Sequence, residues 1–136
     1  MTALLDTGFL LAVLDEDDDL HAACVAALLT EPEPILPDVV LPELAYMTIR
    51  ELGYDTLTGF LHSVLAGEVP VERSTPSDLE RSIEIMNKYR DSRIDFVDSV
   101  IAAIAERLDI RTILTVDRRH FQMLRPQKFT HFTVLP

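Results

Sequence analysis

The chain lacks the features on which exported and membrane proteins rely. Its 136 residues include a single cysteine, Cys24, so no internal disulfide can form, which suits a reducing compartment. No apolar run approaches the roughly 20 residues that a membrane-spanning helix needs. No basic segment precedes the apolar start, as it would in a secretion signal. We therefore expect a cytoplasmic protein without a membrane partner.

Positive charge is absent from the first third of the chain. Residues 1–49 contain ten Asp or Glu and no Lys or Arg, whereas residues 50–136 contain thirteen acids and all twelve bases. The net charge of −11 argues against a nucleic-acid partner, but nearly all of it belongs to the first part. Bases near Asp98 and Asp117 indicate a rim that holds phosphates, although isolated solvated charges are the plainer alternative. These bases are Arg90, Arg93, Arg118, Arg119, Arg125 and Lys128.

What the chain does contain is an alternation of strand-like and helix-like apolar segments. Its length and 48% apolar content indicate one domain over residues 1–136. The alternation favours an α/β fold, in which helices cover both faces of a mostly parallel sheet. Strands are expected at 2–5, 35–36, 69–72, 112–116 and 132–135, helices at 7–15, 19–30, 37–52, 55–66, 75–89 and 95–108, and a single turn at 118–121.

Polar residues mark the expected helix starts. Thr7 is the expected N-cap of the first helix, and Thr75, followed by Pro76, is the expected N-cap of the helix at 75–89. The acidic run at 15–19 has neither the alternating ligands nor the glycine of a calcium loop. It therefore predicts a solvated turn in which Asp17 or Asp18 caps the next helix.

Four acidic residues stand beside apolar segments that are far apart in the sequence. Asp6 and Asp117 directly follow expected strands, at the sheet edge where open α/β folds bind ligands. Glu43 and Asp98 lie within expected helices, where each alone could be a surface or capping residue. Carboxylates that converge repel one another, so the set is tolerable mainly if a divalent cation neutralises it. The pattern therefore predicts a metal site.

The histidines are expected to stay outside this site. His21 and His62 fall on expected helices, His120 on the turn and His131 near the last strand, so each is expected to be structural or at the surface. No histidine or cysteine stands at a metal-ligand spacing. Oxygen-only ligation favours Mg²⁺, or Mn²⁺ as a substitute, over Zn²⁺.

Four sequence blocks resemble those of PIN-domain nucleases. They are Asp6-Thr7-Gly8, Pro42-Glu43-Leu44, the segment from Asp98 to Ala103, and the segment from Thr115 to Phe121. The match spans nearly the whole chain, and a free-standing domain of this length is similar to the VapC-type toxins of toxin–antitoxin pairs. The resemblance implies a three-layer α/β/α fold with a five-stranded sheet in the order 3-2-1-4-5. It also implies a Mg²⁺-dependent endoribonuclease, usually a homodimer, with a cognate antitoxin that blocks the active site.

The resemblance also implies individual roles. Asp6, Glu43 and Asp98 match the three central acids of the family, and Asp117 matches the fourth, so these four are the expected metal-binding and catalytic residues. In this chemistry Mg²⁺ activates water, and in-line attack on RNA leaves a 5′-phosphate and a 3′-hydroxyl.

Other residues are expected to support these acids or the substrate. Thr7 and Thr115 match hydroxyl positions that hold ligands or water, and Ser99 and Asp95 are further candidates for this support. Guanidinium groups bind phosphates well. The candidates for RNA contact are Arg93, Arg118 and Arg119.

Two other classes of protein compete with this interpretation. A phosphorelay receiver needs an acidic pair after the first strand and an acceptor Asp after the third. Here Thr7 and Gly8 follow Asp6, and the third strand has no such Asp. A non-catalytic PIN-fold module that binds protein or RNA remains the alternative, and metal-dependent cleavage of RNA would separate the two.

Overall fold

The computed structural model describes residues 2–136 and has alternating strands and helices. The strands are β1 (Thr2–Leu5), β2 (Glu33–Pro37), β3 (Val71–Glu72), β4 (Thr112–Leu114) and β5 (Thr133–Leu135). The helices are α1 (Thr7–Leu14), α2 (His21–Thr30), α3 (Val40–Leu52), α4 (Tyr54–Leu65), α5 (Pro76–Lys88), the 3₁₀ turn η1 (Arg90–Ser92), α6 (Phe96–Leu108) and α7 (Arg118–Met123). Among residues 2–136, no helix has the length and apolar content to cross a bilayer.

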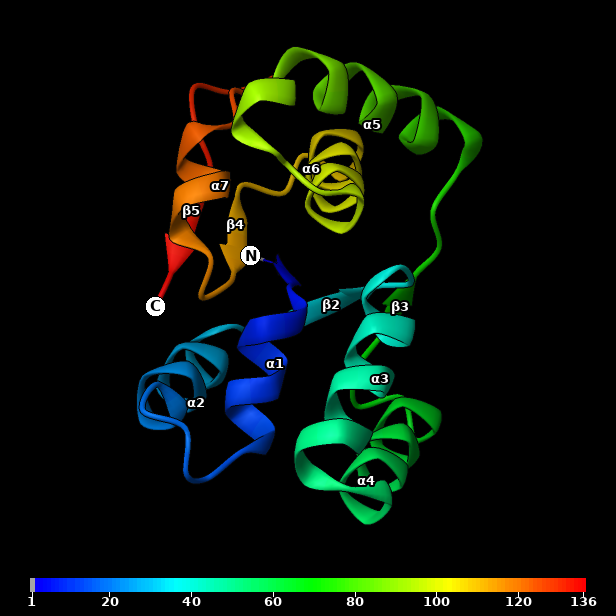
Figure 1. Ribbon diagram of the computed structural model, residues 1–136, viewed down its shortest axis with the longest axis vertical. Helices are drawn as coiled ribbons and strands as arrows, with labels where there is room; N and C mark the ends of the chain where they lie inside the picture. Colours follow the sequence, from blue (N-terminus) through cyan, green and yellow to red (C-terminus); the bar gives the residue numbers. More distant parts are fainter. Residues whose placement is uncertain (1) are drawn as a thin grey trace.

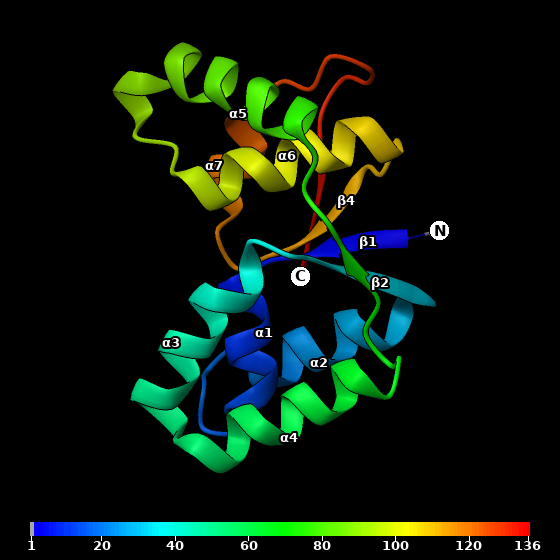
Figure 2. The same ribbon diagram turned by 90° about the vertical axis from the view of Figure 1, so that its right-hand side faces the viewer.

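The five strands form one parallel sheet in the order β3-β2-β1-β4-β5, which confirms the predicted fold class. Helices α1 to α4 lie on one side of the sheet, and α5 and α6 lie on the other (Figure 1, Figure 2). The central strands β1 and β4 contribute fully buried side chains, among them Leu4, Ile113 and Leu114. Because β1 and β4 are adjacent and parallel, the residues that follow them reach the same edge.

Helix α6 is buried around its whole circumference. Every residue from Asp98 to Glu106 is buried, because α6 lies between the sheet and α5 (Figure 1). Two ion pairs join these helices, one from Arg107 to Asp78 at 2.9 Å and one from Arg81 to Glu106 at 2.7 Å. They join α5 to the last turn of α6.

Helix starts were predicted with mixed success. Thr75 caps α5 as expected, and a full capping box joins it to Asp78. The prediction that Thr7 caps α1 was wrong, because Asp6 is the N-cap and Thr7 is the first helical residue. The prediction that Asp17 or Asp18 caps α2 was also wrong. Leu20 precedes α2 without a side-chain cap, while the Asp18 carboxylate accepts the Leu20 N–H within the preceding turn.

Strand β2 begins earlier than predicted. The strand was expected at residues 35–36, yet β2 starts at Glu33 and includes Pro34. Proline has no N–H to donate to a neighbouring strand. Pro34 lies opposite Ala3 of β1, but the N–H of Leu36, two residues later, is donated to Pro70 on the β3 side. The missing N–H of Pro34 would therefore face β3, which pairs with β2 only at Leu36 and Pro37.

Candidate active site

Asp6 lies at the carboxyl end of β1 and is almost completely buried, with 6% of its surface exposed. Its Oδ1 accepts the Thr7 N–H at 2.8 Å, and its Oδ2 accepts the Thr115 hydroxyl at 2.6 Å. The Thr115 Oγ1 also accepts the Asp117 N–H at 2.9 Å. Thr115 therefore connects the ends of β1 and β4 and fixes the orientation of the Asp6 carboxylate.

Asp98 enters the same region from the first turn of α6. Asp95 is the N-cap of this helix, and its Oδ1 accepts the Asp98 N–H at 2.8 Å. The Ser99 hydroxyl donates to the Asp95 carbonyl oxygen at 2.7 Å, so Ser99 uses its hydrogen within the helix. Asp95 and Ser99 thus act on Asp98 by fixing the first turn of α6.

Glu43 and Asp117 complete the set of acids. Glu43 lies in the first turn of α3 and is partly buried. Its charge raises the pKa of both Asp6 and Asp98, which places it in the same electrostatic field. Asp117 is the N-cap of α7. Asp6, Glu43 and Asp117 therefore all lie close enough to Asp98 to raise its pKa.

His120 lies within this cluster, so the expectation that the histidines stay outside the site was wrong for this residue. Its Nδ1 lies 2.9 Å from Asp98 Oδ2 and 2.9 Å from Asp117 Oδ2. The three ligand atoms lie within 4.8 Å of one another. The sequence contained a signal for the contact between His120 and Asp117, since an N-cap Asp and the residue three positions later share one helix face. However, the single turn expected at 118–121 did not predict that this face lies against Asp98.

Burial and mutual repulsion strongly perturb the two innermost carboxyls. Burial is the main cause that raises the pKa of Asp6 from 3.8 to about 6, against the hydrogen bonds from Thr115 and Thr7, which lower it. Burial followed by the charges of Asp6, Asp95, Asp117 and Glu43 raises the pKa of Asp98 from 3.8 to about 9. Ionised Asp98 is therefore unfavourable unless a cation compensates it.

The residues present fit a divalent ion. Carboxylates from β1, α3, α6 and α7 supply hard oxygen donors, and His120 adds a nitrogen. The Thr7 hydroxyl is buried beside Asp6 and has no hydrogen-bond partner within residues 2–136. A buried hydroxyl without a partner is costly, and the hydration of a nearby ion would satisfy it.

The candidate RNA-binding arginines lie near the acids in the chain and are exposed. Arg93 ends η1 in a left-handed conformation, with φ of 58°, two residues before Asp95. Arg118 and Arg119 begin α7 directly after Asp117. The Arg118 guanidinium donates to the Pro136 carbonyl oxygen, which ties it to the end of β5.

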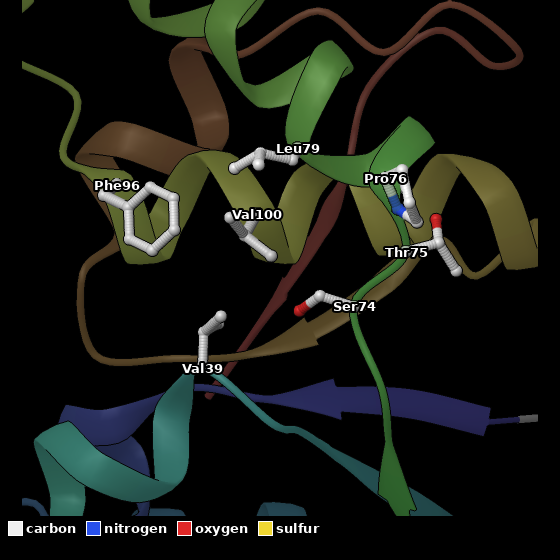
Figure 3. A pocket seen from close by; sticks show the side chains of 7 residues that line it. All are labelled: Val39, Ser74, Thr75, Pro76, Leu79, Phe96 and Val100. Atoms are coloured by element: carbon white, nitrogen blue, oxygen red, sulfur yellow. The ribbon is translucent and has the colours of Figure 1, made fainter.

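A separate hollow of about 380 Å³ opens between α5, α6 and the start of α3 (Figure 3). Its walls are mostly apolar, and no titratable side chain lines it, so it offers no ligand to a metal ion. It is lined by Val39, Ser74, Thr75, Pro76, Leu79, Phe96 and Val100. The chemistry therefore belongs to the acid cluster.

Solved structures share this fold. VapC20 from Mycobacterium tuberculosis, a sarcin–ricin loop cleaving toxin, superimposes with a TM-score of 0.80 at 21% identity, over 88% of this chain and 92% of that chain. VapBC2 from Rickettsia felis, bound to a DNA fragment from the promoter, superimposes with a TM-score of 0.72 at 15% identity, over 98% of this chain and 97% of that chain.

Sequence comparisons establish the family. Ribonuclease VapC26 from M. tuberculosis is 33% identical over 134 residues, which cover 98% of this chain and 99% of that protein. The model of the PIN domain family matches residues 3–125. Together with the sheet order and the placement of the acids, these matches show that the chain belongs to the PIN domain family.

Proposed function

We propose that this protein is a divalent-metal-dependent endoribonuclease and the toxin of a toxin–antitoxin pair. The observation that carries the proposal is the cluster of Asp98, Asp117 and His120, whose ligand atoms lie within 4.8 Å of one another, with Asp6, Glu43 and Asp95 close enough to raise the pKa of Asp98. Membership of the PIN domain family and 33% identity to a ribonuclease support RNA as the substrate. In this proposal residues 1–136 form a single nuclease domain.

The roles of the residues follow from their contacts. Asp6, Glu43, Asp98 and Asp117 hold Mg²⁺, for which Mn²⁺ substitutes. Such an ion, when bound, acidifies water for attack and neutralises charge on the scissile phosphate. Thr115 orients Asp6 through the hydrogen bond at 2.6 Å, and Asp95 fixes the turn that presents Asp98. Arg93, Arg118 and Arg119 contact phosphates that flank the cut.

The partners are RNA, a cognate antitoxin and a second copy of the chain. Structures with the same fold include a toxin–antitoxin complex from Klebsiella pneumoniae and the R. felis VapBC2 complex, and both support an antitoxin partner. An antitoxin that covers the acid cluster would prevent substrate from reaching it. Sedimentation of the purified chain alone and with its antitoxin tests both forms of association.

Replacement of Asp98 or Asp6 by Asn should abolish cleavage and leave the protein folded. Loss of a residue that hydrogen-bonds to a metal ligand typically lowers activity about 10- to 100-fold. Loss of a ligand itself should therefore lower activity more than about 100-fold. The assay treats total bacterial RNA with wild type and variants in Mg²⁺ or Mn²⁺ and sequences the new 5′-phosphate ends. Asp55→Asn is the matched control, because Asp55 is exposed on α4.

Circular dichroism should show that all the variants keep the native fold. Undiminished cleavage by both Asp98→Asn and Asp6→Asn would reject this active site. If the wild type leaves RNA intact in Mg²⁺, in Mn²⁺ and in the metal-free control with EDTA, the protein would instead be a non-catalytic binding module.

A further inference from the structure

A single ring nitrogen of His120 faces two carboxylates. The Nδ1 lies 2.9 Å from Asp98 Oδ2 and 2.9 Å from Asp117 Oδ2, yet it can carry only one hydrogen. Only the contact to Asp98 has hydrogen-bond geometry. The close approach to Asp117 therefore leaves one carboxylate oxygen beside the nitrogen without a hydrogen between them.

These distances match the edges of an octahedral coordination shell. Ligands about 2.1 Å from an ion and at right angles to each other lie roughly 3 Å apart, whereas tetrahedral ligands at that radius lie roughly 3.4 Å apart. Two of the three edges in this cluster are 2.9 Å, and the third separation is no more than 4.8 Å. An ion can therefore contact all three atoms with little movement of the side chains.

The backbone holds His120 in this position. Asp117 caps α7, and its Oδ1 accepts the His120 N–H at 3.4 Å, so ring and carboxylate share one turn of helix. The His120 side chain is 20% exposed and the Asp117 side chain 41% exposed, whereas the Asp98 side chain is only 6% exposed. The cluster thus has a buried carboxyl group on one side and a side open to ions from solvent on the other.

We propose that His120 binds the metal ion through Nδ1, together with Asp98 and Asp117, and makes the site favour Mn²⁺ over Mg²⁺ more strongly than carboxylates alone would. The inference rests on the proposed function, because it concerns the ion of that same site. Imidazole nitrogen suits first-row transition ions, whereas Mg²⁺ demands oxygen ligands and gives up water reluctantly. In its neutral Nε2–H tautomer, His120 presents the Nδ1 lone pair to the ion.

The variant His120→Asn tests whether His120 binds the ion through its nitrogen or only lies next to it. The Asn side chain can place an amide oxygen where Nδ1 lies, which restores an oxygen-only site at similar geometry. Calorimetry should show that the preference for Mn²⁺ over Mg²⁺, expressed as a ratio of Kd values, falls about tenfold or more in this variant. His62→Asn is the matched control, because His62 is exposed on α4, and it should keep the wild-type ratio.

A spectroscopic readout detects the nitrogen ligand directly. Pulsed electron paramagnetic resonance of one equivalent of Mn²⁺ bound to wild type should show coupling to an imidazole ¹⁴N, and this coupling should vanish in His120→Asn. Absence of the coupling in wild type, or an unchanged Kd ratio in the variant, would overturn the role of His120. If wild type nevertheless cleaves RNA with Mg²⁺, the proposed function survives and only this inference fails.

Discussion

At the scale of single residues, the most informative group is the Asp98 carboxyl. Burial and four neighbouring acids raise its pKa from 3.8 to about 9, and burial raises that of Asp6 to about 6. Near neutral pH the metal-free folded protein therefore keeps a proton on Asp98 that the unfolded chain releases. Unfolding then becomes more favourable as pH rises, which is the reverse of the effect of a salt-bridged carboxylate.

The pH window follows from these values. Each such group lowers the free energy of unfolding by up to about 1.4 kcal/mol per pH unit between its unfolded and folded pKa values. Both carboxyls contribute from about pH 4 to 6, and Asp98 alone contributes from about pH 6 to 9. Below about pH 4 both groups are protonated in the folded and the unfolded state, so neither lowers the free energy of unfolding there.

Asp98→Asn should therefore be more stable than wild type at pH 8 in EDTA, because Asn cannot ionise. Its free energy of unfolding should change less between pH 6 and 8.5 than that of wild type. Urea denaturation across this range measures the difference, and the exposed control Asp55→Asn should follow wild type. Parallel curves for wild type and Asp98→Asn would mean that Asp98 ionises in the folded protein without penalty.

At the scale of secondary-structure elements, the contact between α1 and the segment after β4 is the tightest constraint near the site. A Cβ placed on Gly8 would lie 2.8 Å from Val116 Cγ2, closer than real side chains approach. Val116 stands between Thr115, which binds Asp6, and Asp117. Gly8 thus lets α1 pack against the residues that connect the two carboxylates.

Gly8→Ala should destabilise the fold by about 1–3 kcal/mol, the usual cost of overpacking. Alanine in a helix interior normally stabilises by about 0.5–1 kcal/mol relative to glycine, so the sign itself is diagnostic. Gly59→Ala is the matched control, because the added Cβ in α4 would have no atom within 4 Å apart from its chain neighbours and the backbone of its own helix, and it should be stabilising. Urea denaturation of both variants provides the comparison.

Val116→Ala should relieve the clash. A double-mutant cycle should therefore give a favourable coupling between Gly8→Ala and Val116→Ala. Additive effects of the two substitutions would show that the helix accommodates the new methyl group in another way.

At the scale of the whole molecule, charge is divided between acidic and mixed segments. All twelve Lys and Arg follow residue 49, and Arg118 and Arg119 begin the short helix that carries His120. The protein carries a net charge of −11, so phosphates of RNA need a local basic contact to approach the acids. The two arginines differ, because Arg118 is held by the Pro136 carbonyl, whereas Arg119 makes no ion pair within residues 2–136.

Arg119→Gln should reduce the salt dependence of RNA binding more than Arg118→Gln does. Each lost phosphate contact lowers the slope of log affinity against log salt by about 0.7 for a single strand. Fluorescence anisotropy with a labelled single-stranded RNA, in EDTA at several salt concentrations, measures this slope. Equal slopes for wild type and Arg119→Gln would assign phosphate binding elsewhere, with Arg93 as the next candidate.

The parts of the fold that depend on local sequence were predictable. Apolar periodicity indicated the strands and helices in their correct order, and the capping box at Thr75 correctly located the start of α5. Asp6 and Asp117 were expected to follow strands, and β1 and β4 place them at a common edge. These features could be inferred because they depend on the conformation of a few consecutive residues, which side-chain sterics and hydrogen bonding within one turn control. The catalytic roles of the acids stay predictions.

Local sequence was enough to predict the order of the elements, the parallel α/β architecture, and the carboxylates of Asp6 and Asp117 that follow strands. It was not enough to predict which polar partners meet, namely Thr115 with Asp6 and His120 with Asp98. These pairs join residues 109 and 22 positions apart, and no local pattern encodes such a contact. The first pair depends on the pairing of β1 with β4, and the second depends on how α7 packs beside α6. Only such tertiary contacts bring side chains of distant segments within hydrogen-bonding distance.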